Sequence, residues 1–400
     1  MQKEQARLTG KRFLLPFILI TALFFLWGFA RAILDVLNKH LQNEMEISIT
    51  QSALIQVTTF LGYFLMAIPA GILINRRGYR QGVVLGLLLF AAGSLLFVPG
   101  TWLGSFWAFL LALFVIGCGL VFLETAANPY VTELGPASTS TSRLNLSQSF
   151  NGLGSLFATF AVGQFFFREG DEAGNVALPY TVLGIIVLLI AFLFSRVDLP
   201  EIVHDDPEAS SRGLRSLSAP LRKPLFVFGL LALLSYEVAE ISINSYFINF
   251  VTGMGWMDDN LASVILTCAL ALFMVGRFLG SWVMKWIRPE QMLLLCALGT
   301  VVSVSLVLCD LGRCSLLALL GIYFFEAIMF PTIFSLTLRG LGNLTKSAAS
   351  LLMMTPVGGC GFLLMGWLAD GGKVQLPFLI PLLGFLVVLA YSVRIMRERK

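Results

Sequence analysis

Charged side chains are scarce in this sequence: Asp, Glu, Lys and Arg together make up 12% of its 400 residues. Soluble domains carry about 25% charged and roughly 45 to 50% apolar residues. This chain is instead 57% hydrophobic, with a mean hydropathy of +0.85. The scarcity of charge excludes an ordinary soluble domain and predicts a protein that crosses a membrane many times.

Several motifs of energy-coupled and catalytic proteins are absent. The sequence has no Gly-x4-Gly-Lys-Ser/Thr phosphate loop, no His-Glu-x2-His, no Gly-x-Ser-x-Gly and no Cys-x2-Cys. The six cysteines fall in or beside apolar runs without the spacing of metal ligands. We therefore expect no enzyme, no metal and no cofactor, and an energy source that is an ion gradient or the substrate's own gradient.

Long apolar runs dominate what is present. A membrane-spanning helix needs about 20 mostly apolar residues, and 37 glycines and 34 phenylalanines fit closely packed helices better than the strands of a barrel. The sequence predicts an all-α polytopic membrane protein with twelve transmembrane helices. The predicted spans are 14–41, 51–75, 82–98, 103–132, 144–167, 178–196, 224–252, 260–287, 291–309, 315–338, 347–368 and 376–394.

Most of the 27 Lys and Arg residues fall at both termini and in alternate loops between the predicted spans. Cytoplasmic loops retain positive charge during insertion, so this pattern predicts that the N and C termini both lie in the cytoplasm. The net charge of +4 is then explained by the positive cytoplasmic loops, so it gives no reason to expect binding to nucleic acid.

The chain divides into two similar halves. A hydrophilic linker at 197–223 separates predicted bundles at 1–196 and 224–400, each with six spans. Glu326 follows Glu124 by the same 202 residues by which Glu237 follows Asp35. A shared offset predicts two pseudo-symmetric six-helix bundles that enclose a central cavity.

Carboxylates occur in the first, fourth, seventh and tenth predicted spans, one helix from each quarter of the chain. An acid at mid-membrane depth costs at least about 2.5 to 3.5 kcal/mol on insertion scales, so this clustering indicates a functional polar path. The acids are Asp35, Glu124, Glu237 with Glu240, and Glu326.

Several segments resemble one family of membrane transporters. Residues 71–80, GILINRRGYR, are similar to the signature loop of the major facilitator superfamily, although Asn75 replaces the usual acid. The strings LETAANPYV at 123–131, RLNLSQSFNGLG at 143–154, GRFLG at 276–280, IMFPTIF at 328–334 and GWLAD at 366–370 resemble its fucose-galactose-glucose:proton symporter family. The resemblance covers nearly the whole chain and implies the fold of that superfamily.

By this resemblance, Asp35 and Glu124 match two acids implicated in proton coupling and sugar recognition, and Gln148 and Asn151 match polar cavity positions. The context of Glu240 is also similar to the family's seventh span. One family member has amides where this chain has Arg31, Ala32 and Leu34, and many relatives have an amide at the position of Glu326. The identity of the sugar therefore stays open.

The residues themselves suggest further site members. Arg31 lies four residues before Asp35 on the same helical face and either holds it ionised in one state or forms a static pair with it. Arg277 is a candidate structural partner of Glu240. We expect substrate contacts from residues in both halves: Asn128, Gln148, Asn151, Tyr236, Glu240, Asn244 and Glu326.

The combined prediction is a monomeric carrier in a bacterial inner membrane that takes up a hexose or deoxyhexose, such as fucose, glucose or galactose, with a proton. The alternatives are a sodium-coupled sugar symporter, an exporter of amphipathic compounds and a membrane sensor that binds sugar without transporting it. Which acid takes which role is left open by the sequence.

Overall fold

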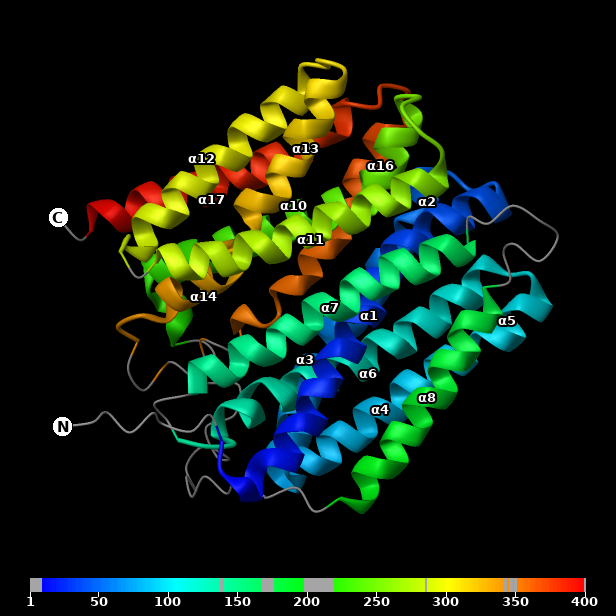
Figure 1. Cartoon of the computed structure of the whole chain (residues 1–400), viewed down its shortest axis with the longest axis vertical. Helices are drawn as coiled ribbons and strands as arrows, with labels where there is room; N and C mark the ends of the chain where they lie inside the picture. The colour runs from blue at the N-terminus through cyan, green and yellow to red at the C-terminus, as the bar shows by residue number, and fades with distance from the viewer. Residues whose placement is uncertain are drawn as a thin grey trace. The chain divides into compact units, whose positions relative to one another are not determined.

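The structure is a computed structural model, and residues 9–136, 140–166, 176–197, 219–284, 286–341, 344, 348 and 351–398 are described. Every regular element in these ranges is a helix (Figure 1). The elements are η1 (Lys11–Phe13), α1 (Leu14–Met45), α2 (Ile49–Ser52), α3 (Leu54–Arg77), α4 (Tyr79–Leu95), α5 (Phe97–Leu103), α6 (Phe106–Glu133), α7 (Ser140–Phe166), α8 (Ala177–Arg196), η3 (Pro220–Arg222), α10 (Pro224–Gly253), α11 (Asp259–Val283), α12 (Pro289–Leu308), α13 (Arg313–Glu326), α14 (Met329–Leu338), η5 (Thr355–Gly361), α16 (Phe362–Asp370), η6 (Leu376–Phe378) and α17 (Leu379–Arg397).

Ten helical stretches in the described part of the chain are long and apolar enough to cross a membrane, and they match ten of the twelve predicted spans. The predicted span 144–167 falls on α7, where residues such as Ser147, Gln148 and Asn151 lower the hydropathy. The predicted span 347–368 falls on η5 and α16, and several of its residues lie outside the described ranges. Residues 198–218 of the predicted linker lie outside them as well.

The chain forms two compact units. The first unit contains Met1–Leu34 and Leu61–Asp206, and the second contains Asp35–Phe60 and Pro207–Lys400. The segment 35–60, which comprises the end of α1, α2 and the start of α3, thus packs with the second half of the chain.

Close helix contacts in the first unit depend on glycine. α4, α6 and α8 lie side by side (Figure 1). A Cβ added to Gly86 of α4 would lie 2.9 Å from the carbonyl oxygen of Gly119, and one added to Gly119 of α6 would lie 2.6 Å from that of Gly86. Membrane helices gain stability from such close backbone packing, because lipid offers little hydrophobic drive for their association.

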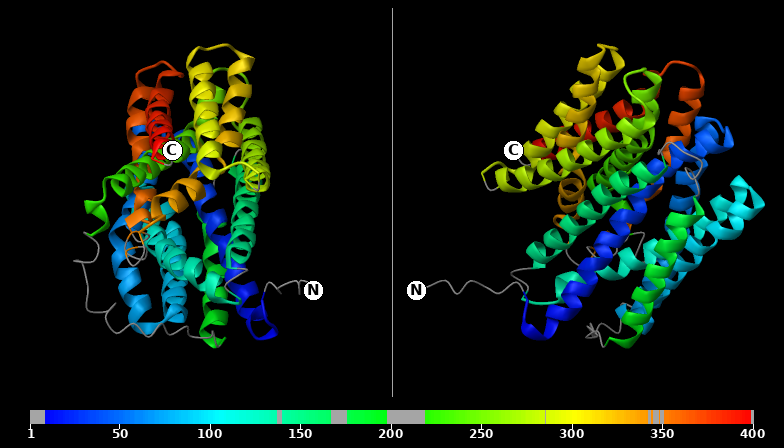
Figure 2. Two further views of the ribbon diagram at one scale, coloured as in Figure 1. Left: turned by 90° about the vertical axis from the view of Figure 1, so that its left-hand side faces the viewer. Right: turned by 45° about the vertical axis from the view of Figure 1, so that its right-hand side comes forward.

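The second unit is built around α10, which packs against α17, η5, α14 and α11. The pair α12 and α13 runs side by side in both views of Figure 2. The ring of Phe325 fills the space over Gly299, where an added Cβ would lie 2.6 Å from the ring. This packing fixes the end of α13 against α12.

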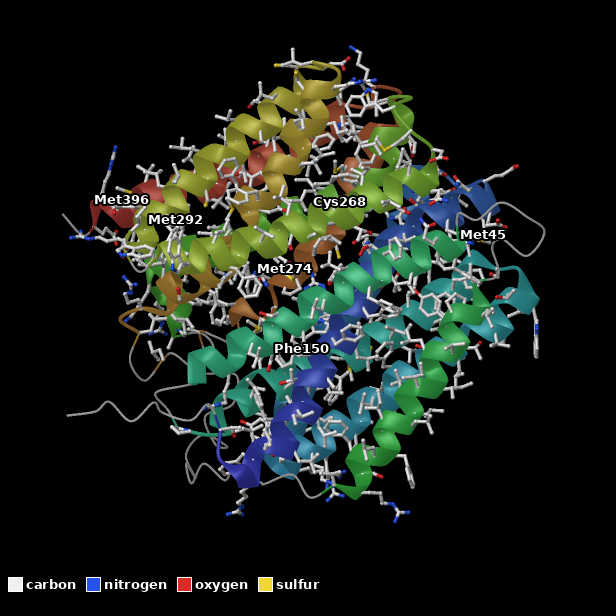
Figure 3. All side chains as sticks on the ribbon, viewed as in Figure 1. Met45, Phe150, Cys268, Met274, Met292 and Met396 are labelled. Atoms are coloured by element: carbon white, nitrogen blue, oxygen red, sulfur yellow. The ribbon has the colours of Figure 1, made fainter. Side chains whose placement is uncertain are left out.

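The outward faces of the helices are apolar. Trp107 and Phe192 expose 72% and 60% of their surface, and Phe150 of α7 and Cys268 of α11 are also exposed (Figure 3). Exposed aromatic and aliphatic side chains on this scale suit a lipid surround.

The predicted tenth span is broken in the structure. α13 ends at Glu326 and α14 begins at Met329. Pro331 lacks the N–H that would bond to the carbonyl oxygen of Ala327 in a continuous helix. The Nε–H group of Arg277 donates to that oxygen instead, at 3.1 Å. A side chain thus replaces the missing backbone bond, and Glu326 lies directly at the break.

Candidate functional site

In the first unit, the crossing of α1 and α7 positions the predicted polar residues. A Cβ at Gly28 would lie 2.0 Å from the carbonyl oxygen of Asn151, and one at Gly154 would lie 2.0 Å from that of Phe25. The two helices therefore touch through their backbones. The Ser155 hydroxyl donates to the carbonyl oxygen of Gly28 at 3.2 Å, across the same crossing.

Asn151 also takes part in this crossing. Its side-chain amide donates to the carbonyl oxygen of Phe24 at 3.2 Å. Gln148, one turn earlier on α7, donates through Nε2 to Oδ1 of Asn128 on α6 at 3.4 Å. The structure thus brings the predicted residues Asn128 and Gln148 together, while Asn151 contacts the α1 backbone.

Glu124 of α6 is half-buried, and the Arg31 guanidinium acts on it electrostatically. The sequence suggested Asp35 as the partner of Arg31, and an interaction that the structure shows for Arg31 is with Glu124. One turn before Arg31, the indole N–H group of Trp27 is buried without a hydrogen-bond partner among the described residues. This N–H group is a free donor on the same face of α1 as Arg31.

In the second unit, Asp35 belongs to a hydrogen-bonded network. Its Oδ1 accepts from the Ser245 hydroxyl of α10 at 2.9 Å and from Nε2 of Gln56 of α3 at 3.3 Å. The Gln56 amide also donates to Ser245 at 2.7 Å. Donors directed at a carboxylate oxygen stabilise its ionised form. The structure thus directs two donors, from α3 and α10, at Oδ1 of Asp35.

Glu326 has the opposite surroundings. It is 0% exposed, and neither carboxyl oxygen has a hydrogen-bond partner among the described residues. The group that acts on it electrostatically is a second acid, Glu240 of α10. An unpaired carboxylate in such a site costs several kcal/mol, whereas a neutral carboxylic acid avoids most of that cost.

Two buried tyrosines stand beside these acids. The Tyr236 hydroxyl donates to the backbone carbonyl oxygen of Glu326 at 3.4 Å. The Tyr323 hydroxyl is buried without a partner in the described residues and lies within electrostatic range of Glu326, Asp35 and Glu240. Tyr323 thus links the two acid environments of the second unit.

Polar side chains recur along α10 at helical spacing. Tyr236, Glu240 and Asn244 are four residues apart and lie on one face. The side-chain oxygen of Asn244 is buried with no partner among the described residues. Glu237 is 2% exposed and packs against η5. A Cβ added to Gly358 of η5 would lie 2.9 Å from the Cβ of Glu237. The more exposed Glu240 and the buried Glu237 therefore have different surroundings.

Arg277 of α11 lies beside this cluster. Besides its bond to Ala327, its guanidinium stands 4.7 Å from the ring centroid of Phe273, and it acts electrostatically on Tyr236. A cation suits the C-terminal end of α13, where carbonyl groups concentrate partial negative charge. Arg277 thus supports the helix break at which Glu326 lies.

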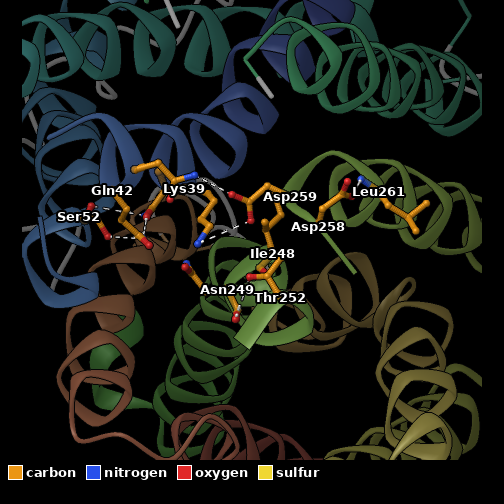
Figure 4. Close-up of polar contacts among 11 residues, drawn as sticks. Lys39, Gln42, Ser52, Ile248, Asn249, Thr252, Asp258, Asp259 and Leu261 are labelled. Carbon is orange, nitrogen blue, oxygen red and sulfur yellow. Dashed lines mark hydrogen bonds and ion pairs between the residues drawn. The ribbon is translucent and has the colours of Figure 1, made fainter. Parts of the chain in front are cut away.

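A pocket of about 480 Å³ opens at the end of α10 beyond Asn244. Lys39, Asn249 and Asp259 line it, together with apolar residues from α2 and α16. Lys39 Nζ lies 3.7 Å from Asp259, and the Asn43 amide donates to the same carboxylate at 2.7 Å (Figure 4). The side-chain amide nitrogen of Asn249 is buried there without a partner among the described residues.

The sequence missed Gln56, Ser245 and Tyr323 as site residues. Gln56 is a polar residue inside an apolar run, which is a usable signal. Ser245 and Tyr323 have no such signal, because hydroxyls are common in membrane helices and only the contacts across helices reveal their roles.

The sequence of residues 19–360 matches the protein-family model of the Major Facilitator Superfamily. A glucose/galactose transporter of Brucella abortus is 36% identical over 387 residues, covering 93% of this chain and 92% of the relative. The L-fucose-proton symporter of Escherichia coli is 34% identical over 416 residues, covering 96% and 93%.

Solved structures of transporters also resemble this chain in fold. The crystal structure of the E. coli fucose:proton symporter matches 96% of this chain and 99% of its own, with a TM-score of 0.74 and 32% identity. A bacterial homologue of the human lysosomal transporter Spinster, in an inward-facing conformation, matches with a TM-score of 0.77 at 14% identity, which supports the fold alone. The chain is a multi-pass membrane protein, not an enzyme, and it belongs to the Major Facilitator Superfamily.

Proposed function

We propose that the protein is a secondary active transporter that takes up a monosaccharide together with a proton by alternating access. The named relatives transport glucose and galactose or L-fucose, so a hexose or deoxyhexose is the expected substrate class. The single observation that carries the proposal is Asp35, an acid on a membrane helix that is held by Ser245 and Gln56 within a group of further acids.

The polar residues of α10 provide a route for a sugar in this proposal. Asn249 lines the open pocket, Asn244 and Ser245 lie about one turn closer to mid-helix, and Glu240 lies one turn further. Among the described residues, the side-chain oxygen of Asn244 and the side-chain nitrogen of Asn249 have no partner, and they suit sugar hydroxyls, which both donate and accept hydrogen bonds. In the first unit, Asn128, Gln148 and the Trp27 N–H group offer the same chemistry.

The proposed alternation requires contacts that break and reform. Besides Asp35, other residues of segment 35–60 also contact the rest of the second unit. The backbone N–H groups of Ile49 and Thr50 donate to the Asp370 carboxylate at 3.0 and 3.1 Å, and Lys39 pairs with Asp259. If the predicted bundle 1–196 moves as one body, opening this end of the molecule breaks these contacts. We propose that they hold this end closed in one state of the cycle.

A proton gradient supplies enough energy for this work. Moving one charge down about 100 mV releases roughly 2.3 kcal/mol, which supports some fifty-fold accumulation of sugar. In the proposed cycle, protonation permits sugar binding on one side, and release of sugar and proton on the other side resets the carrier. Asp35 and Glu124 are the proposed proton-coupling residues, and Arg31 sets the charge around Glu124.

We place the protein in a bacterial inner membrane, as a monomer with both termini in the cytoplasm. This topology follows from the Lys and Arg distribution. On this topology Lys39 and Lys373 lie at the outer end, so the pocket that contains Lys39 and Asp259 faces the medium from which sugar enters.

The test is uptake of labelled glucose, galactose and L-fucose into sealed vesicles with an imposed proton gradient. We expect accumulation that a protonophore abolishes, and its loss in Asp35→Asn and Glu124→Gln with sugar exchange retained. Glu398→Gln is the matched control, because Glu398 pairs with Arg394 at the exposed end of α17.

The alternatives give different results in the same vesicles. Accumulation that follows sodium and ignores the proton gradient would replace the proton by sodium. Sugar binding with no flux would identify a sensor. Efflux of amphipathic dyes without sugar-dependent proton movement would identify an exporter.

A further inference from the structure

The Glu326 carboxyl group is buried, unpaired and next to another acid. It has 0% exposure, and both of its oxygens lack a hydrogen-bond partner among the described residues. Asp35, in contrast, is half-buried, and Ser245 and Gln56 donate hydrogen bonds to its carboxylate. The two acids therefore favour opposite protonation states in the same unit.

The charged and titratable groups around Glu326 come from three helices. Tyr323 precedes it by one turn on α13, and α10 contributes Tyr236 and Glu240. The cation of the cluster, Arg277 of α11, uses its Nε–H group to satisfy the Ala327 carbonyl oxygen. Among the described residues, the Glu326 carboxyl group thus has a negative neighbour and accepts no hydrogen bond, which favours the neutral acid.

The position of Glu326 on the backbone allows these surroundings to change. It is the last residue of α13, and Pro331 removes the helical hydrogen bond to Ala327. The arrangement at this break is held by the side chain of Arg277. Glu326 therefore lies at a point where the backbone ladder is already interrupted and where a side chain, not a helical hydrogen bond, holds the arrangement.

We propose that Glu326 is a second proton-binding site of the transport cycle, which holds a proton in the conformation seen here and releases it when the helix break rearranges. The release breaks one O–H bond of the carboxylic acid, transfers the proton to water and leaves a carboxylate. A proton from water on the opposite side restores the acid. This inference rests on the proposed function, and it assigns to the cycle a proton in addition to the one carried through Asp35 and Glu124.

The first test counts protons. The membrane potential at which sugar flux reverses, measured in vesicles with fixed sugar and proton gradients, gives the number of protons moved per sugar. Glutamine imitates the neutral acid in shape and hydrogen bonding but cannot exchange a proton. We expect Glu326→Gln to bind and exchange sugar at rates within about twofold of wild type and to move one proton fewer per sugar. An unchanged ratio would overturn the proposal.

The second test does not depend on transport. Infrared difference spectra of the purified protein, recorded while the pH is raised, report the C=O stretch of each protonated carboxylic acid. We expect a band at neutral pH in wild type that is absent in Glu326→Gln and retained in the control Glu398→Gln. A band of equal size in Glu326→Gln would show that Glu326 is ionised and would overturn the proposal.

The two tests separate the failure of this inference from the failure of the proposed function. If wild-type vesicles show no proton-driven sugar uptake, the function is wrong, and the infrared band still decides the state of Glu326. If uptake is proton-driven and the band is present but the ratio is unchanged, Glu326 is a permanently neutral acid and the second proton site is rejected.

Discussion

Glu124 and Glu326 occupy equivalent positions in the two halves of the chain, five residues before Pro129 and Pro331, yet their surroundings differ. Glu124 lies within the continuous helix α6, is half-buried and interacts with the Arg31 cation. Glu326 lies at the break between α13 and α14, is fully buried and faces the acid Glu240. The two halves thus carry similarly placed carboxylates whose charged neighbours have opposite signs.

The helix crossings near the two acids also differ between the halves of the chain. In the first half, α1 crosses the continuous helix α7 at Gly28 and Gly154. In the second half, α10 crosses the 3₁₀ segment η5 at Gly358, where a Cβ would lie 2.9 Å from the carbonyl oxygen of Leu234. The first half thus has regular helices at its acid, and the second has irregular segments on two sides of α10. Irregular backbone in a membrane protein is typical of substrate sites and moving parts.

The largest expected effect comes from removing the ionisable group of the first half. Glu124→Gln leaves a neutral side chain beside Arg31, so protonation no longer changes the charge there. We expect accumulation to fall by the factor that one charge supplies, about fifty-fold at 100 mV. Uptake under a proton gradient measures the loss, and sugar exchange at equal concentrations is the control for a folded carrier. Full accumulation in Glu124→Gln would remove the functional difference between the two acids.

A smaller effect should follow from removing the cation instead. In Arg31→Gln, the ionised form of Glu124 loses its favourable electrostatic partner, so proton release requires more alkaline conditions. We expect the pH for half-maximal sugar exchange to rise. The matched variant Arg277→Gln should destabilise the α13–α14 break without such a rise, because Arg277 bonds to the Ala327 carbonyl oxygen. Equal pH profiles for Arg31→Gln and wild type would contradict the assignment.

The helix crossings can be compared by thermal unfolding in detergent. Gly154→Ala introduces a methyl group 2.0 Å from the Phe25 carbonyl oxygen, and overpacking of this kind costs about 1 to 3 kcal/mol. Gly358→Ala meets its neighbours at 2.9 Å, so we expect a smaller loss of stability. Gly71→Ala is the control, since a Cβ there has no neighbour within 4 Å. A loss in Gly71→Ala as large as in Gly154→Ala would contradict the packing account.

The smallest expected effect concerns segment 35–60. Asp370→Asn removes the negative charge that faces the N-terminus of α2, an interaction worth about 0.3 to 1 kcal/mol. We expect a severalfold shift toward the state open at that end, measured as faster labelling of a cysteine placed at Asn249 in the pocket. Unchanged labelling would show that Asp370 does not help to hold this end closed.

The sequence predicted the helical fold and the acids, and it could not predict how the acids are paired. Apolar runs and the rule for positive charge locate helices because each span must satisfy its backbone internally. The break after Glu326 did not follow from Pro331 alone, since α6 continues through Pro129. Likewise, the donors to Asp35 come from Gln56 and Ser245, which are far apart in the chain and meet only through packing.

The most direct test of the central claim is the external pH of lightly buffered, de-energised cells or vesicles after a pulse of sugar. If the carboxyl groups bind protons that move with the sugar, the medium becomes alkaline in wild type and Glu398→Gln, and by less in Glu326→Gln and in Glu124→Gln. Entry of sugar into wild-type vesicles without any change in external pH would contradict the account.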